Sequence, residues 1–101
     1  MLILNDMLNK VNQNLRNESL LALETLEKLN QPNTSELQSK LRYCIGSFDF
    51  DKNPVGLHEY AIVALQTLKD IKKDSPRRVP KKVVDGLETS IHKYESLRSA
   101  D

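Results

Sequence analysis

Apolar residues recur every three or four positions along the chain, which is the spacing of amphipathic helices rather than of strands. The first such segment covers about residues 3–15, and its apolar positions are Leu4, Met7, Leu8, Val11 and Leu15. Asn17 favours a helix N-terminus, so a second helix is predicted to follow it with the apolar row Leu20, Leu23, Leu26 and Leu29. Pro32 cannot continue that helix. The pattern therefore predicts two separate helices before residue 32.

A third helix is predicted between Pro32 and Asn53. Ser35 and Gln38 have the spacing of a capping box at its start. Gly46 is expected to loosen its last turn, because glycine lowers helix stability. Its apolar stripe consists of Leu37, Leu41, Cys44, Ile45 and Phe48.

A fourth helix has the clearest start, because Asn53 can cap it and Pro54 fits the first helical position. Ile62 and Val63 widen its apolar face, which predicts a central place in the fold. The face itself consists of Leu57, Tyr60, Ala61, Ala64, Leu65, Leu68 and Ile71. The segment DSPRRVP (74–80) breaks this helix, and a fifth helix begins at about Pro80 with Val83, Leu87, Ile91, Tyr94 and Leu97 inside.

These elements predict a single all-α domain over residues 1–101, either an antiparallel bundle of four to five helices or two stacked helical hairpins with an extra N-terminal helix. ALETLEKL (22–29) aligns with ALQTLKDI (64–71), as in a HEAT-type duplication, although amphipathic helices also align by chance. The expected core is Leu8, Val11, Leu23, Leu26, Leu37, Leu41, Ile45, Tyr60, Ala64, Leu65, Leu68, Val83, Leu87 and Ile91.

Composition narrows the function classes. Fifteen Lys and Arg against fourteen Asp and Glu give a net charge of +1, so no overall field favours nucleic acid or membranes. A lone Cys44 excludes an internal disulfide and favours a reducing compartment. The N-terminus lacks the basic start and long apolar run of a signal peptide. A cytoplasmic location is therefore expected.

Candidate chemistry is sparse. FDFDKNPVG (48–56) places Asp49, Asp51 and Asn53 at alternate positions, as in an EF-hand loop, but the required Gly and Glu do not follow at their positions. A helix-to-helix turn with capping side chains is the better interpretation. His58 is expected at the surface and His92 has no metal-binding spacing. We therefore predict no catalytic, metal or cofactor site, and Cys44 is interpreted as a core residue.

Charge is uneven in one region. Seven of the fifteen basic residues fall within residues 69–82, against only two acidic ones. This basic cluster is the candidate partner-binding site, and it consists of Lys69, Lys72, Lys73, Arg77, Arg78, Lys81 and Lys82. A solvated helix end is the simpler interpretation, because lysines at a helix C-terminus also favour the macrodipole.

Three segments resemble the small immunity proteins that protect lactic acid bacteria from pediocin-like bacteriocins. They are NESLLALETLEKL (17–29), SKLRYCI (39–45) and LHEYAIVALQTLKDI (57–71), and the resemblance covers residues 4–71. It implies a cytoplasmic bundle of four antiparallel helices that binds a sugar-transporter receptor complex without catalysis. After Ile71 a regular fifth helix and a short tail replace the family's helix and flexible, toxin-recognising tail, so no family site residue is transferred.

Three functions follow as hypotheses. The first is a non-catalytic protein that acts by protein–protein interaction, and in particular an immunity protein. The sequence is also compatible with a homodimer. The alternative is a binder of nucleic acid or of an anionic membrane surface through the basic cluster. The third, an enzyme or metal protein, would require His58, His92 or Asp49 to converge in a pocket.

Overall fold

The computed structural model describes the backbone of residues 2–99 and the side chains of residues 6–98. Within this range the chain forms four α-helices and one short 3-10 turn, which confirms the all-α prediction. These are α1 (Leu2–Leu29), the 3-10 turn η1 (Pro32–Thr34), α2 (Ser35–Asp51), α3 (Val55–Asp74) and α4 (Lys81–Ser99).

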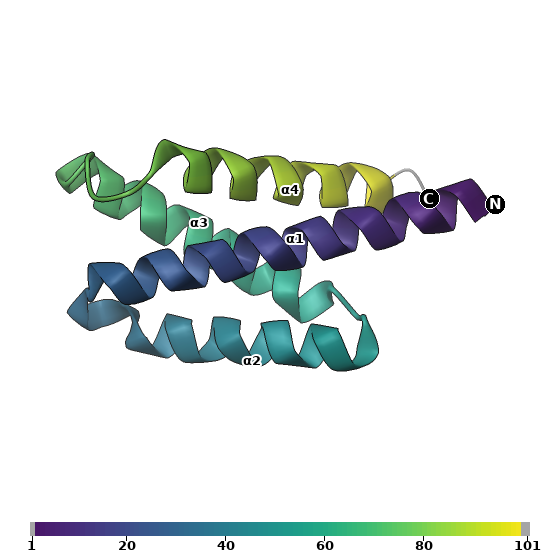
Figure 1. The fold of residues 1–101 in the computed structure, drawn as a ribbon, viewed down its shortest axis with the longest axis horizontal. Coiled ribbons are helices and arrows are strands. Elements are labelled where there is room, and N and C mark those ends of the chain that lie inside the picture. The colour runs from purple at the N-terminus through teal and green to yellow at the C-terminus, as the bar shows by residue number, and fades with distance from the viewer. Residues whose placement is uncertain (1, 100–101) are drawn as a thin grey trace.

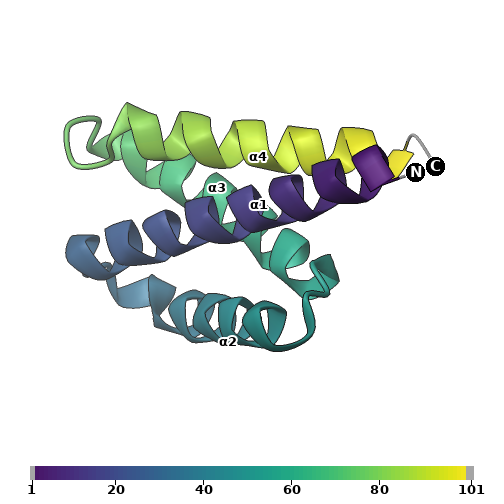
Figure 2. The same ribbon diagram turned by 45° about the vertical axis from the view of Figure 1, so that its right-hand side comes forward.

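The four helices form an elongated bundle of 45 × 24 × 16 Å. α1 runs through its middle, with α2 along one side and α4 along the other, while α3 crosses behind α1 (Figures 1 and 2). α1 and α4 run antiparallel and side by side over most of the length of α4 (Figure 1). α1 and α3 each pack against all three other helices, so they form the centre of the bundle.

α1 is one continuous helix, so the prediction of separate helices over 3–15 and after Asn17 is wrong. The Asn17 amide oxygen accepts hydrogen bonds from Gln13 and Arg16 instead of capping a new helix. One buried row continues through the expected break, at Leu15, Ser19, Ala22, Leu26 and Leu29. Ser19 is fully buried in this row, and its polar side chain hides the continuity in the sequence pattern.

The turn between α1 and α2 also differs from expectation. α2 begins at Ser35, after the Thr34 cap position, and the capping box does not form. Gln38 Nε2 donates instead to Thr34 Oγ1 at 3.0 Å, and that hydroxyl donates to the Gln31 carbonyl. Gly46 does not loosen the last turn, because α2 continues to Asp51.

The FDFDKNPVG segment is a helix-to-helix turn, as predicted. Asp51 Oδ1 accepts a hydrogen bond from the Asn53 backbone at 2.9 Å, and Asn53 Oδ1 accepts one from the Val55 backbone at 3.1 Å. Lys52 adopts a left-handed conformation with φ of 61°, which ends α2. Asp51 and Asn53 thus hold the turn through local hydrogen bonds, whereas the cap position of α3 is Pro54 rather than the predicted Asn53, and the helix begins at Val55.

The core follows the predicted stripes closely. Of the fourteen expected residues, eight are buried, namely Leu23, Leu26, Leu41, Ile45, Ala64, Leu68, Leu87 and Ile91. The other six are partly buried. Val79 and Val84 were not expected in the core and are buried as well. Ile62 and Val63 do not widen the buried face of α3, because their side chains are 41% and 44% exposed.

The proposed duplication stays a prediction. Its two segments lie in the C-terminal halves of α1 and α3, and each of these helices is followed by another helix. Ala22 and Leu26 in the first segment align with Ala64 and Leu68 in the second, and all four are fully buried.

Candidate functional site

Three members of the basic cluster, Lys69, Lys72 and Arg78, make polar contacts within the fold, and Arg78 is at the same time exposed. Lys69 Nζ lies 2.8 Å from Glu88 Oε2 and joins α3 to α4. Lys72 Nζ donates to the Val79 carbonyl at 2.7 Å, and Arg78 Nη2 donates to the Leu29 carbonyl at 2.9 Å. The cluster is therefore not one uniform binding surface.

The remaining four basic residues are Lys73, Arg77, Lys81 and Lys82, and all four are exposed. Lys73 and Arg77 lie at the corner between α3 and α4. Lys82 belongs to a different environment, because it lines a groove between α4 and α1.

The histidines and Asp49 lie in separate surroundings. His58 is not at the surface, as expected from the sequence, because its side chain is only 13% exposed. Its Nε2 lies 2.8 Å from Glu95 Oε2, and its ring packs against Tyr94 with centroids 4.7 Å apart. His92 is exposed on α4, and Asp49 forms a two-pronged ion pair with Arg16. Over the described residues, no three His, Cys, Asp or Glu side chains gather as metal ligands.

Cys44 lies in the core beneath the start of α3. Burial raises the pKa of its thiol, and the nearby Glu59 carboxylate raises it further. A raised pKa leaves less thiolate at neutral pH, so this side chain is poorly suited to nucleophilic chemistry. This agrees with its interpretation as a packing residue.

A concave feature, a groove, runs along the α1–α4 pair. Two cavities, of about 660 and 410 Å³, share Thr89 and Lys93 in their walls and therefore adjoin. We call this combined feature the α1–α4 groove. α1 contributes Met7, Val11, Asn14, Asn17 and Glu18, and α4 contributes Lys82, Asp85, Gly86, Thr89, Ser90, His92, Lys93, Ser96 and Leu97.

The groove lining follows helical spacing on both sides. Met7, Val11, Asn14 and Glu18 lie at intervals of four, three and four residues along α1, so they share one face. The α4 positions from Lys82 to Leu97 extend over about 22 Å at 1.5 Å of rise per residue. The groove is therefore about as long as a helix of four turns.

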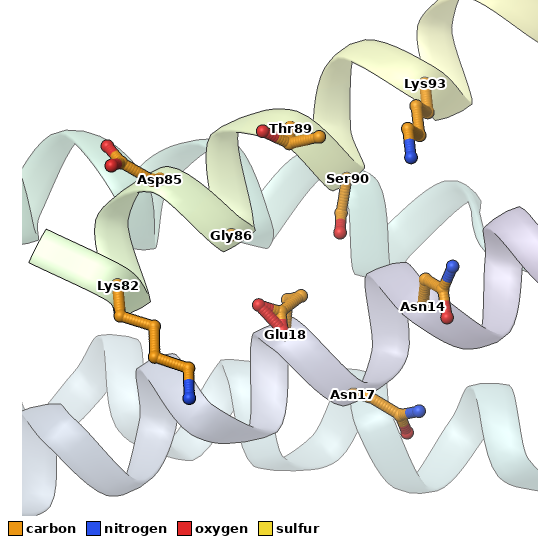
Figure 3. Close-up of a pocket in the computed structure, with 9 residues that line it drawn as sticks. All are labelled: Asn14, Asn17, Glu18, Lys82, Asp85, Gly86, Thr89, Ser90 and Lys93. Carbon is orange, nitrogen blue, oxygen red and sulfur yellow. The ribbon is translucent and has the colours of Figure 1, made fainter.

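The two ends of the groove differ in chemistry. Met7, Val11 and Leu97 make the end near the chain termini apolar. The other part is polar, and Glu18 rises there from α1 toward α4 (Figure 3). Lys82 and Lys93 extend from α4 toward α1 on either side of Glu18 (Figure 3). The groove is therefore asymmetric along its length, with one apolar end and one charged end.

Gly86 allows Glu18 to occupy its position. A β-carbon added at Gly86 would overlap Oε1 of Glu18, so a larger residue there would require the end of the Glu18 side chain to turn away from this face of α4. The glycine thus has a local packing reason inside a helix, where it would otherwise cost stability.

The charged side chains of the groove lack ion-pair partners within the part of the chain that the structure describes. Glu18, Lys82, Asp85 and Lys93 form no ion pair or side-chain hydrogen bond there. Elsewhere the described residues form five ion pairs, which are Arg16–Asp49, Lys40–Glu36, Arg42–Glu27, His58–Glu95 and Lys69–Glu88. These charges of the groove therefore remain available to a partner, as do exposed charges elsewhere, such as Lys73, Arg77 and Lys81.

Sequence reasoning did not identify this groove. Two signals could have pointed to it, namely Gly86 inside a predicted helix and the extension of the Met7–Val11 row into Asn14 and Glu18. Neither indicates that α1 and α4 lie side by side.

No protein-family model, curated protein or solved structure matches this chain. None of the helices among the described residues is both long and apolar enough to cross a membrane.

Proposed function

We propose that this chain is a non-catalytic protein-binding module whose α1–α4 groove receives a helix of a partner protein. The observation that carries the proposal is the groove itself, which combines an apolar end with four charged side chains that have no ion-pair partner among residues 6–98. Two adjacent helices leave a furrow that a third helix can fill by ridge-into-groove packing. Amphipathic helices bind such furrows through apolar anchors spaced along one face.

We further propose that its biological role is that of an immunity protein against pediocin-like bacteriocins. The support is the resemblance over residues 4–71, together with the helix count. Four antiparallel helices are what the resemblance implies, and the continuous α1 removes the extra helix that the sequence pattern predicted. The partner would then be the sugar-transporter receptor complex at the inner face of the membrane.

The experiment is a protection assay. The chain is expressed in a lactic acid bacterium that is sensitive to a panel of pediocin-like bacteriocins, and survival is compared with that of cells carrying an empty vector. The role predicts that survival rises for at least one bacteriocin. No protection against any member of the panel, with the protein present at normal levels in the cells, would contradict the immunity role.

A matched pair of variants tests whether the groove carries this function. Met7→Asp places a charge at the apolar end of the groove, where the native side chain is 47% exposed. Val63→Asp makes the same kind of change on α3, outside the groove, where the native side chain is 44% exposed. We expect protection to be lost in the first variant and kept in the second. Equal protection by both variants would show that the groove is not needed for protection.

A second candidate function is binding to an anionic membrane surface at the corner between α3 and α4. The favouring observation is that Lys73, Arg77 and Lys81 are exposed there. Sedimentation with phosphatidylglycerol vesicles at low and high salt tests it. Binding that disappears in salt and in Arg77→Ala supports this candidate, and no sedimentation at low salt rejects it.

A further inference from the structure

Glu18 occupies an unusual electrostatic position. Its carboxylate lies against the α4 backbone at Gly86, in the polar part of the α1–α4 groove (Figure 3). The residue is partly buried and forms no ion pair within residues 6–98. A carboxylate that is partly removed from water gains most from a cation that can approach it directly. Glu18 is therefore ready to receive a cationic group from outside the chain.

The neighbours of Glu18 leave this position open. Asn14, Asn17 and Ser90 are neutral, and Asp85 adds a second negative charge from α4. Lys82 and Lys93 lie on either side without pairing with it. Both lysines are exposed and have flexible stems, so they can turn toward acidic groups of a bound partner.

The charges and the apolar end follow one another along α4. Leu97 marks the apolar end, Lys93 follows one turn away, Gly86 marks the Glu18 position and Lys82 is one turn further. The intervals are four, seven and four residues, which keep all four positions on one face of a helix. A helix lying along the groove would meet these positions in the same order.

We propose that Glu18 determines partner specificity by receiving a lysine or arginine side chain from an amphipathic helix of the partner protein. This inference rests on the proposed function of the groove. The complementary helix carries an apolar residue, an acidic residue, a basic residue and an acidic residue at positions i, i+4, i+11 and i+15, or in the reverse order. Charge complementarity selects this helix over purely apolar or purely basic ones.

A display library of 18-residue amphipathic helices, randomised on one face, supplies the probes. The full chain is the bait. Helices that bind it but do not bind the Met7→Asp variant are kept, because this dependence on Met7 shows that they bind in the groove. We expect the selected helices to share a basic residue at one position. Glu18→Gln, which keeps the side-chain size, should weaken their binding about tenfold. When the Glu18→Lys variant is the bait, the selected helices should carry an acidic residue at the same position.

Glu24→Lys is the matched control, because Glu24 is exposed on α1 and lies outside the groove. It changes the net charge of the protein as Glu18→Lys does. We expect it to leave both the affinity and the selected residues unchanged.

The outcomes separate this inference from the proposed function. Binders that depend on Met7 but bind Glu18→Gln and Glu18→Lys equally well would overturn the role of Glu18 and leave the groove function intact. A loss of affinity in Glu24→Lys equal to that in Glu18→Lys would reduce the effect to net charge and also overturn it. If no selected helix depends on Met7, both the specificity role and helix binding in the groove are rejected.

Discussion

Arg78 Nη2 donates a hydrogen bond to the carbonyl oxygen of Leu29, at a distance of 2.9 Å. Leu29 is the last residue of α1, and the final carbonyls of a helix have no partners within that helix. A cation at this end also interacts favourably with the helix dipole. Arg78 thus closes the C-terminus of α1 from the loop between α3 and α4, 49 residues away in sequence.

Replacing Arg78 should therefore affect stability, whereas replacing its neighbour should not. We expect Arg78→Ala to lower the free energy of unfolding by about 1 kcal/mol, because it leaves the Leu29 carbonyl without this donor. Both arginines are exposed, but Arg77 forms no ion pair or side-chain hydrogen bond within residues 6–98, so Arg77→Ala should change stability by less than about 0.5 kcal/mol. Urea denaturation followed by circular dichroism measures both values. Equal values for the two variants would contradict a structural role for Arg78.

The two histidines offer a second matched pair. His58 packs against Tyr94 and lies 2.8 Å from Glu95, so it joins α3 to α4. We expect His58→Ala to lower the free energy of unfolding by about 1–2 kcal/mol at pH 7, because it removes both the packing and the polar contact.

His92→Ala is the control, because that side chain is exposed on the surface of α4. It should change the free energy of unfolding by less than about 0.5 kcal/mol. Thermal denaturation of both variants decides the matter, and an unchanged melting temperature for His58→Ala would show that its packing does not contribute to stability.

The apolar rows predicted the helical class and most of the core because burial requires regular spacing. Leu41, Ile45, Leu68 and Leu87 are all buried as expected. The bundle has four helices, within the predicted four to five, but the helix break predicted at Asn17 was wrong because helix breaks depend on local competition between side chains. Asn17 can cap a helix in principle, but packing of Leu15 and the residues after it keeps α1 continuous.

The candidate site was less predictable than the fold. Its residues come from two helices that are more than sixty positions apart, and a periodic pattern contains no information about which helices lie side by side. The basic cluster was visible in the sequence, but the intramolecular contacts of Lys72 and Arg78 depend on tertiary geometry. Charge density along a chain therefore overstates the charge that a folded surface presents.

The ion pair between Arg16 and Asp49 predicts a specific pH dependence. Two hydrogen bonds of 3.0 and 2.9 Å join the guanidinium to the carboxylate. The Arg16 hydrogen bond lowers the pKa of Asp49 below its usual 3.8, and the Arg16 and Lys52 charges act in the same direction. The contribution of Asp49 to stability is therefore fully present above about pH 5, and it is lost as the pH falls through the lowered pKa.

Asp49→Asn isolates this effect from other carboxylates, such as Glu88, whose pKa is also lowered. At pH 7 we expect the variant to be less stable than the wild type by about 0.5–1 kcal/mol, as is typical of an exposed pair. The difference should shrink as the pH falls toward 2, because the wild-type carboxyl group is protonated as the pH passes through its lowered pKa. Urea titrations at pH 7, 5 and 2 measure the trend. A difference that stays constant across this range would contradict it.

The helical glycines provide the sharpest test of the groove geometry. An added β-carbon at Gly46 meets no atom within 4 Å, whereas at Gly86 it overlaps Glu18. Gly46→Ala should therefore stabilise the protein by about 0.5–1 kcal/mol, the usual gain in a helix interior. Gly86→Ala should lose part of that gain, because the end of the Glu18 side chain must move.

Glu18→Ala removes the obstructing carboxylate and provides a double-mutant test of this explanation. In that background Gly86→Ala should recover a gain close to that of Gly46→Ala, so the two sites couple by about 0.5 kcal/mol. Gly46→Ala serves as the uncoupled control and should give the same gain with or without Glu18. Chemical denaturation of the single and double variants gives all the required values. Suppose that Gly86→Ala stabilises the wild type as much as Gly46→Ala does. The Glu18 carboxylate then does not depend on a glycine at position 86 and does not lie against it.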